Sequence, residues 1–190
     1  AIDWARPFVR IEYAELFAQA TGFDCRDKAK VRAKASEIGV QDAAERDHWL
    51  LVDHLFEELA EPLIDPTRPT FVTGYPSAVS PLTRPMSEDP DFCERWDIFV
   101  AGMEVGPSYT ELNDPDIQEA KFTEQLSGAD DEDQAFRSLD ADFLEALRVG
   151  MPPAGGLGIG VDRVIMLLTG QRTIREVIAF PLMRPEGGGD

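Results

Sequence analysis

Apolar residues in the first third of the chain recur at helical spacing. A long amphipathic helix with one packed face is predicted over residues 44–63. Its apolar positions are Trp49, Val52, Leu55, Phe56 and Leu59. Two shorter helices are predicted over residues 12–21 and 28–38, because a glycine follows each segment directly, Gly22 after the first and Gly39 after the second. Residues 1–66 are therefore expected to form a helical segment and insertion.

The pattern changes after the prolines at positions 66 and 69. A strand is predicted to run through Tyr75, and two further strands flank a predicted turn at Ala101-Gly102. Residues 81–90 are expected to form an exposed loop. This pattern predicts an α+β fold, with an antiparallel sheet from about residue 69 to residue 181 flanked by helices.

Two more helices interrupt the sheet region. One is predicted over residues 116–126 and the other over residues 140–149, with Asp140 as its N-cap. An acidic linker is expected between them, over residues 127–132. The sheet core is assigned to residues 67–186, and the tail 187–190 is expected to be disordered.

Composition narrows the function classes. The 190 residues include 36 acidic and 18 basic side chains, a formal net charge of −18, which argues against a broad phosphate-binding surface. Cys25 and Cys93 have no metal-ligand spacing and are expected to be reduced thiols of a cytoplasmic protein. His48 and His54 lack a companion cluster, so structural roles are expected for both. No apolar stretch approaches the roughly 20 residues that span a bilayer.

A glycine run near the carboxyl end suggests a ligand site. Gly156, Gly158 and Gly160 alternate along a predicted strand, which suits a backbone lying close to a flat ligand or to another segment. Arg163 follows at the junction with a predicted helix that stops at Gly170, where a guanidinium could grip a phosphate or stack on adenine. The run by itself is equally consistent with a glycine-rich strand and a surface arginine.

Acidic side chains on the preceding strands favour the ligand site. A hairpin would bring Asp97 and Glu104 together, and Mg²⁺ prefers one or two carboxylates alongside phosphate oxygens. Alternation then places Pro107, Tyr109 and Glu111 on one face. The alternative for each acid is a solvated strand face in a chain rich in Asp and Glu.

Three stretches resemble the carboxyl-terminal half of class II lysyl-tRNA synthetases. They are EVGPSYTELNDP from residue 104, MPPAGGLGIGVDR from residue 151 and VIAFPLMRPE from residue 177. The second is similar to the third signature motif of that class. Residues 7–11 resemble the segment that follows the second signature motif, and residues 70–76 and 80–82 resemble the strand and turn before the metal-binding hairpin.

The resemblance implies a role for each of these positions. Glu111 would take the ε-ammonium of lysine, Tyr109 and Gly156 would border the substrate, and Asp97 and Glu104 would bind the Mg²⁺ on ATP. Arg163 would contact ATP and act in catalysis, and the glycine strand with Gly158 and Gly160 would form the floor of the adenosine pocket. Physical chemistry agrees for Glu111, because an ammonium taken out of water needs a fixed counter-charge.

The resemblance also implies a reaction and partners. The lysine carboxylate would attack the α-phosphate of ATP and pyrophosphate would leave, with catalysis by alignment and charge neutralisation and without a general base. The partners would be lysine, ATP and tRNA(Lys), the last through parts of the parent chain that are not present here, and the full-length parent would form a homodimer.

The chain departs from the family pattern in several ways. The family usually has Glu at the position of Asp97, and it often has Asn at the position of Pro107, where proline offers no donor for the lysine carboxylate. The first two signature motifs and the anticodon-binding barrel do not appear, and Arg10 is no substitute for the second motif's arginine. The chain is therefore expected to be part of a longer enzyme and to be inactive alone.

Two other functions remain open. One is a non-catalytic paralogue that binds a partner or senses lysine, and the other is a ligase that attaches lysine to a protein. The synthetase hypothesis depends on Glu111 and Arg163 facing a shared cavity.

Overall fold

The computed structural model describes residues 1–127 and 140–181. It divides into two compact units, Ala1–Gly158 and Ile159–Asp190. The predicted tail over residues 187–190 lies outside the described residues, as does all of the predicted acidic linker except residue 127. The predicted domain boundary between residues 66 and 67 stays a prediction.

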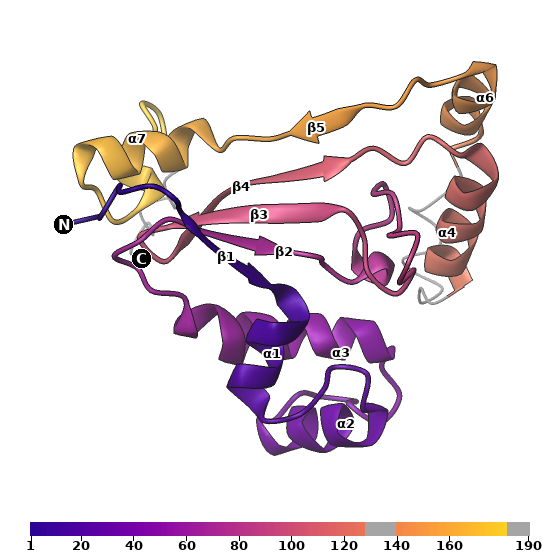
Figure 1. Ribbon diagram of the computed structural model, residues 1–190, viewed down its shortest axis with the longest axis horizontal. Helices are drawn as coiled ribbons and strands as arrows, with labels where there is room; N and C mark the ends of the chain where they lie inside the picture. The colour runs from indigo at the N-terminus through magenta and orange to yellow at the C-terminus, as the bar shows by residue number, and fades with distance from the viewer. Residues whose placement is uncertain (128–139, 182–190) are drawn as a thin grey trace, which may run out of the picture. The chain divides into compact units, whose positions relative to one another are not determined.

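Three helices form a lobe at the start of the first unit (Figure 1). They are α1 (Tyr13–Thr21), α2 (Lys28–Glu37) and α3 (His48–Leu55). The helix α1 stops as predicted at Gly22, whose φ of 82° is left-handed and whose N–H donates to the Ala18 carbonyl. The left-handed Gly39, with φ of 86°, follows α2 in the same way.

The long helix predicted over residues 44–63 is shorter and irregular. It begins at residue 48 because the Asp47 side chain accepts hydrogen bonds from the N–H groups of Trp49 and Leu50. After Leu55 it continues as a π-helical segment, η1 (Phe56–Ala60), and a 3-10 turn, η2 (Glu61–Leu63). The apolar face is nevertheless packed as predicted, since Val52, Leu55 and Phe56 are buried.

The first unit contains a five-stranded sheet in the order β1-β2-β3-β4-β5. The strands are β1 (Val9–Glu12), β2 (Thr70–Thr73), β3 (Arg95–Val100), β4 (Met103–Thr110) and β5 (Gly155–Leu157). The α+β class is confirmed, but two details of the sheet differ from the prediction. Among the described residues the last strand ends at Leu157, short of Gly158, Gly160 and the predicted limit near residue 181. Residues 9–12, assigned to the helical segment, form an edge strand parallel to β2, and the helical lobe is the long crossover that a parallel pair requires.

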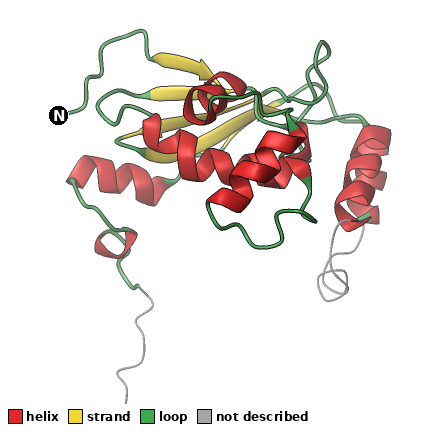
Figure 2. Cartoon of the chain, turned by 90° about the horizontal axis from the view of Figure 1, so that it is seen from below, coloured by secondary structure: helices red, strands yellow, loops and turns green. Residues whose placement is uncertain are grey.

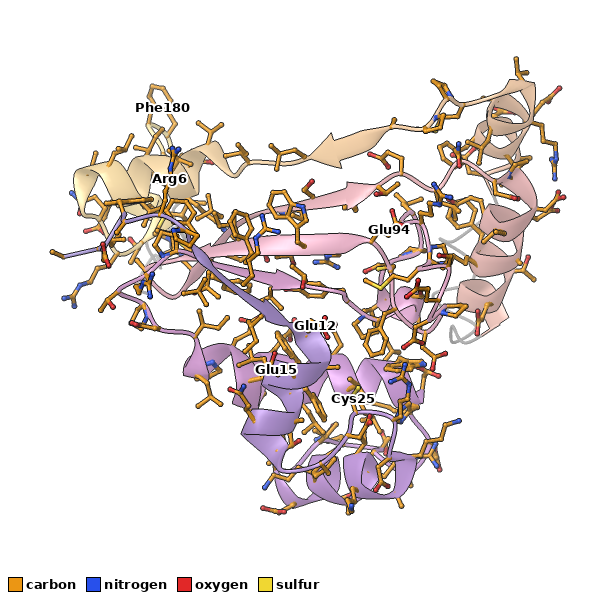
Figure 3. All side chains as sticks on the ribbon, in the orientation of Figure 1. Arg6, Glu12, Glu15, Cys25, Glu94 and Phe180 are labelled. Atoms are coloured by element: carbon orange, nitrogen blue, oxygen red, sulfur yellow. The ribbon has the colours of Figure 1, made fainter. Side chains whose placement is uncertain are left out.

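The hydrophobic core lies between the lobe and one face of the sheet. Val72 on β2 and Phe99 on β3 are buried against the lobe, where the Tyr13 and Phe56 rings stack with centroids 3.8 Å apart. Figure 2 shows the helices of this lobe in front of the strands when the chain is seen from below. Figure 3 shows Glu12 at the junction of β1 and α1, and Cys25 within the lobe.

The segment between β2 and β3 is less exposed than predicted. A short turn, η3 (Ser77–Val79), opens it, and isolated bridges join Thr83 to Glu111 and Pro85 to Cys93. Thr83 is buried, whereas Leu82 and Arg84 on either side are exposed. Part of the predicted loop over residues 81–90 is thus held by isolated bridges, one of which joins it to Glu111 just after β4.

Two helices complete the first unit. These are α4 (Pro115–Ser127) and α6 (Ala141–Val149), which pack together through Phe122 and Phe143 with ring centroids 6.0 Å apart. The predicted cap is confirmed, because the Asp140 side chain accepts a hydrogen bond from the Phe143 N–H.

The second unit contains α7 (Val161–Thr169) and a 3-10 turn, η4 (Ile174–Glu176). The predicted stop at Gly170 is confirmed by its left-handed φ of 69° and its N–H bond to the Met166 carbonyl. Thr173 and Glu176 form a capping box at the start of η4.

Candidate functional site

The predicted hairpin forms at the centre of the sheet. β3 and β4 pair antiparallel and turn at Ala101 and Gly102, whose φ angles are 56° and 73°. Two consecutive left-handed residues are the geometry of the tight turns that suit the strands' twist.

A β-bulge sets the direction of Glu104. Asp97 pairs with Pro107, but Phe99 pairs with Glu104, so that β4 has one extra residue near Val105. Cross-strand partners share a face of the sheet, which places Glu104 on the same side as Asp97 and Pro107. Strict alternation along β4 would have put Glu104 on the opposite side. The bulge therefore brings the two predicted carboxylates to one face.

Asp97 is already bonded within the protein. Its Oδ1 accepts from Arg95 Nε at 2.9 Å and its Oδ2 from Arg95 Nη2 at 2.6 Å. The carboxylate is only 2% exposed. Burial lowers the pKa of Arg95, but the hydrogen bonds and charge of Asp97 more than offset this, so that pKa is raised overall. Asp97 thus presents both oxygens to a guanidinium, and its predicted role as a metal ligand stays a prediction.

Acidic residues that the sequence analysis did not single out lie near the hairpin. Burial, together with the negative charges of Glu57 and Glu104, raises the pKa of Glu61 to about 7. Burial and the charge of Glu57 likewise raise the pKa of Asp53. The available signal was the spacing of positions 53, 57 and 61, which are four apart and so lie on one side of a helix. Among the described residues, no group of three or more His, Cys, Asp or Glu is arranged to hold a metal ion.

Glu111, Tyr109 and Gly156 come together at the end of β4. Tyr109 pairs with Gly156 of β5, and the Glu111 N–H donates to the Ala154 carbonyl at 3.0 Å. A Cβ at position 156 would lie 2.1 Å from Glu111 Oε1 and 3.6 Å from Tyr109 Cε2. The Glu111 carboxylate thus occupies the space that a side chain at 156 would need, which explains the glycine in steric terms.

Gly158 lies beside Pro107. The Gly158 N–H donates to the Pro107 carbonyl at 2.9 Å, which continues the contact between β4 and the glycine segment. A Cβ at 158 would meet the proline ring at 3.7 Å, an ordinary contact. The crowding expected along the glycine run is therefore found at Gly156 and not at Gly158.

Gly160 and Arg163 belong to the second unit. Gly160 is the N-cap residue of α7, and Arg163 is the third residue of that helix, with an exposed side chain. The predicted position of the arginine just after a strand-to-helix junction is confirmed. The expectation that Arg163 shares a cavity with Glu111 connects two units and stays a prediction.

A model of one protein family matches almost the whole chain. It is the family described as tRNA synthetases class II (D, K and N), and the match covers residues 1–184. The chain belongs to this family.

Several curated proteins are similar to this chain over nearly its whole length. Proteins named lysine–tRNA ligase from Chloroflexus aurantiacus and Aquifex aeolicus are 43% and 41% identical over 186 and 189 residues. The alignments cover 96% and 97% of this chain, and 38% and 31% of those relatives. A third, from Thermosynechococcus vestitus, is 42% identical over 99% of the chain. The chain spans about a third of the length of the curated relatives it matches.

Both cysteines and one of the two histidines are buried. Cys25 and Cys93 are both buried and unpaired in disulfides, and burial raises the pKa of Cys25 to about 12. Cys93 donates through Sγ to the Tyr75 carbonyl at 3.2 Å. His48 is buried at the start of α3, and burial lowers its pKa.

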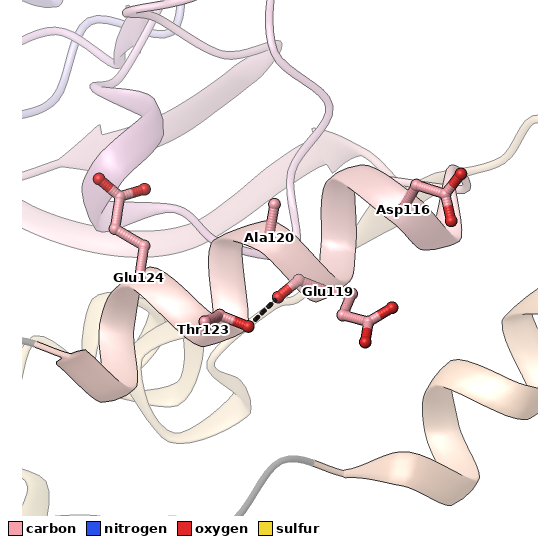
Figure 4. A pocket seen from close by; sticks show the side chains of 5 residues that line it. All are labelled: Asp116, Glu119, Ala120, Thr123 and Glu124. Atoms are coloured by element: carbon pink, nitrogen blue, oxygen red, sulfur yellow. Dashed lines mark hydrogen bonds between the residues drawn. The ribbon is translucent and has the colours of Figure 1, made fainter.

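One surface hollow of the chain lies on α4 (Figure 4). Its lining comes from a single helix and includes Asp116, Glu119 and Glu124, and Thr123 donates to the Glu119 carbonyl at 2.8 Å. None of the predicted site residues lines it. Within residues 1–127 and 140–181, no helix is long and apolar enough to cross a membrane.

Proposed function

We propose that this chain supplies the lysine-binding part of a lysine–tRNA ligase, which activates lysine with ATP for transfer to tRNA(Lys). The observation that carries the proposal is the Glu111 carboxylate, which lies over Gly156 and beside the Tyr109 ring. A carboxylate held by a strand, with a glycine opposite and an aromatic ring at its side, has the charge and shape to accept an alkylammonium.

Membership of the D, K and N group leaves three amino acids to choose from. Aspartate and asparagine carry no positive charge on the side chain, so a carboxylate in their pocket would repel the first and leave itself unpaired with the second. Glu111 therefore favours lysine. The names of the three relatives agree with this choice.

The nucleotide part of the proposal rests on the second unit and the hairpin. Arg163 is proposed to contact ATP, with Gly158 and Gly160 flooring the adenosine pocket. The bulge places Glu104 on the sheet face of Asp97 and Pro107, and Glu104 is proposed as the side chain that binds Mg²⁺ on the nucleotide. The proposed chemistry is attack of the lysine carboxylate on the α-phosphate with departure of pyrophosphate.

The wider setting is proposed on the same basis. tRNA(Lys) and a second copy of the parent chain are the proposed macromolecular partners, and the cytoplasm is the proposed compartment. Two free buried thiols suit a reducing environment. The acidic net charge of −18 implies that most of the tRNA contact lies outside this chain.

Isothermal titration with lysine tests the proposal. Glu111→Gln keeps the shape of the side chain and removes its charge, and is expected to weaken lysine binding by about tenfold to a hundredfold, the worth of a charge-assisted hydrogen bond. The matched control is Glu94→Gln, since Glu94 is an exposed glutamate that directly precedes β3 of the same sheet and is labelled in Figure 3. Equal lysine affinity in wild type and Glu111→Gln would refute the assignment.

A second titration addresses the nucleotide. ATP binding in the presence of Mg²⁺ is expected to be lost in Arg163→Ala. If the chain binds a protein partner in the titration but shows no binding of ATP or lysine, it would instead be a non-catalytic binding paralogue.

A further inference from the structure

The side chain of Asp97 is paired with Arg95. Arg95 stands two residues before it on β3, so both side chains leave the same face of the strand. The guanidinium donates to both carboxylate oxygens, at 2.9 Å and 2.6 Å. This two-point geometry is the strong form of an arginine–carboxylate pair.

Arg95 is itself held on two more sides. Its Nη1 donates to Ser80 Oγ at 3.0 Å, and its Cζ lies 4.2 Å from the centroid of the Tyr75 ring. Ser80 and Tyr75 are each 5% exposed. Three of the five N–H groups of the guanidinium are thus engaged by neighbours that are themselves buried. The arginine is fixed in place, and the carboxylate beside it is 2% exposed.

A carboxylate in this setting is expected to bind a divalent cation weakly. A Mg²⁺ ligand must offer an oxygen at about 2.0–2.1 Å from the ion. Each Asp97 oxygen already accepts an N–H of a cation, so only its second lone pair is left for a metal, beside a positive charge. Bringing a second positive charge next to the partly buried guanidinium, beside a carboxylate that is 2% exposed, would add repulsion where screening is reduced. Losing the pair would leave Arg95 without its counter-charge.

The length of the side chain points the same way. A glutamate at this position would carry one more methylene and reach farther from the sheet. Aspartate keeps its oxygens close to the strand, at the level of the Arg95 guanidinium. Glu104, across the hairpin on the same face, is only partly buried.

We propose that Asp97 is the anchor of Arg95 and not a ligand of the divalent metal ion, so that metal binding on this face depends on Glu104 and not on Asp97. The pair holds Arg95 opposite Tyr109, its cross-strand partner in the proposed lysine site. Arg95 and Asp97 are therefore positioning residues, which link the Tyr75–Ser80 segment to the floor of that site. The metal part of this inference rests on the proposed function, because it concerns the nucleotide of that function.

Mn²⁺·ATP, followed by the enhancement of water-proton relaxation, tests the metal part. Asp97→Asn should change the affinity by less than about twofold, whereas Glu104→Gln should weaken it by about tenfold or more, as expected for loss of a ligand. Asp97→Glu, which restores the longer side chain, should strengthen it by several fold. An equal loss in Asp97→Asn and Glu104→Gln would overturn the proposal.

Thermal unfolding without metal or nucleotide tests the anchor itself. Arg95→Met and Asp97→Asn should each lower Tm by about 5–15 °C, because each leaves a buried partner unpaired. The double variant should lose clearly less than the sum of the two losses. Additive losses would overturn the pairing, whatever the metal result.

The two experiments separate the proposal from the proposed function. If no chain binds Mn²⁺·ATP while Arg95 and Asp97 remain coupled in unfolding, the anchor is supported and the nucleotide part of the proposed function fails. If Mn²⁺·ATP binds and requires Asp97, the proposed function stands and the anchor proposal fails.

Discussion

The two halves of one sheet face differ in what covers them and in what they carry. Along β1 to β3 the face is closed by the helical lobe and holds Val72 and Phe99 in the core. Along β4 and β5 the same face carries Tyr109 and Gly156, and Glu111 follows directly after β4. These residues are only partly buried. The first half contributes apolar side chains to the hydrophobic core, whereas the second half leaves an aromatic ring and a carboxylate partly exposed.

The boundary between the halves falls on the β3–β4 hairpin. Phe99 on β3 belongs to the core, while Asp97 two residues earlier is ion-paired with Arg95. Glu104 joins this boundary only because of the bulge. A sheet can thus change from core to site within one strand pair, provided that each buried charge at the transition has a partner.

The largest expected effect separates stability from binding. Leu51→Ala removes a fully buried side chain from α3 and should lower the free energy of unfolding by about 2–5 kcal/mol through lost burial and the cavity left behind. Leu50→Ala is the matched control, since Leu50 is the neighbouring residue on the same helix and is 56% exposed. Its cost should stay below about 0.5 kcal/mol.

Urea titration followed by circular dichroism gives both free energies. Lysine affinity of the folded fraction should be unchanged in either variant. If Leu51→Ala weakened lysine binding in proportion to its loss of stability, the two halves of the face would not be independent.

A smaller effect is expected in the polar half, and there it should appear in lysine affinity and not in stability. Gly156→Ala would place a Cβ 2.1 Å from Glu111 Oε1, so the carboxylate must turn away. Because the obstructing atom is the end of a flexible side chain, the fold should survive. Lysine binding should weaken by about tenfold to a hundredfold as the counter-charge is displaced.

Gly155→Ala is the control for that change. The nearest atom to a Cβ at 155 is the Tyr109 carbonyl oxygen at 3.9 Å, an ordinary contact. Calorimetric titration of both variants with lysine makes the comparison. Undiminished affinity in Gly156→Ala would show that Glu111 is not held where the structure has it, and unfolding of the variant would show that its carboxylate cannot turn away.

The smallest effect concerns pH and the acids at the boundary. The pKa of Glu61 is raised from 4.5 to about 7, so the folded chain binds this proton more tightly than the unfolded chain. Stability should therefore fall as pH rises from about 4.5 to 7, and the full penalty applies above that window. After discounting for solvent screening, the penalty is about 1 kcal/mol.

Glu61→Gln removes this titration. The variant should be more stable than wild type at pH 8 by about that amount and equal to it at pH 4. Urea unfolding at the two pH values provides the measurement, with exposed Glu94→Gln as the control. A gain that is the same at both pH values would contradict a titration of Glu61.

Local features of this fold followed from the sequence. Helix stops at Gly22 and Gly170 and the turn at Ala101-Gly102 depend on a few adjacent residues, and the structure places them as predicted. The cap at Asp140 is equally local. Each of these devices is encoded by conformational preferences within one turn of chain.

Features that depend on distant segments did not follow. The strand over residues 9–12 is parallel to β2, from which the whole helical lobe separates it, and no periodicity in four residues reveals that partner. The extra residue near Val105 is visible only from the register of two strands. The pairing of Asp97 with Arg95 was within reach of the sequence, since the two alternate on one strand, but the hydrogen bonds were not.

The binding of lysine and norleucine, compared by isothermal titration calorimetry in wild type and Glu111→Gln, tests the central claim most directly. Norleucine has the same four-carbon side chain as lysine but lacks the terminal ammonium. The difference in affinity between the two therefore isolates the contribution of the ammonium group. A carboxylate that holds the ammonium predicts that wild type prefers lysine by about tenfold or more and that Glu111→Gln loses most of this preference. An unchanged preference for lysine in Glu111→Gln would contradict the account.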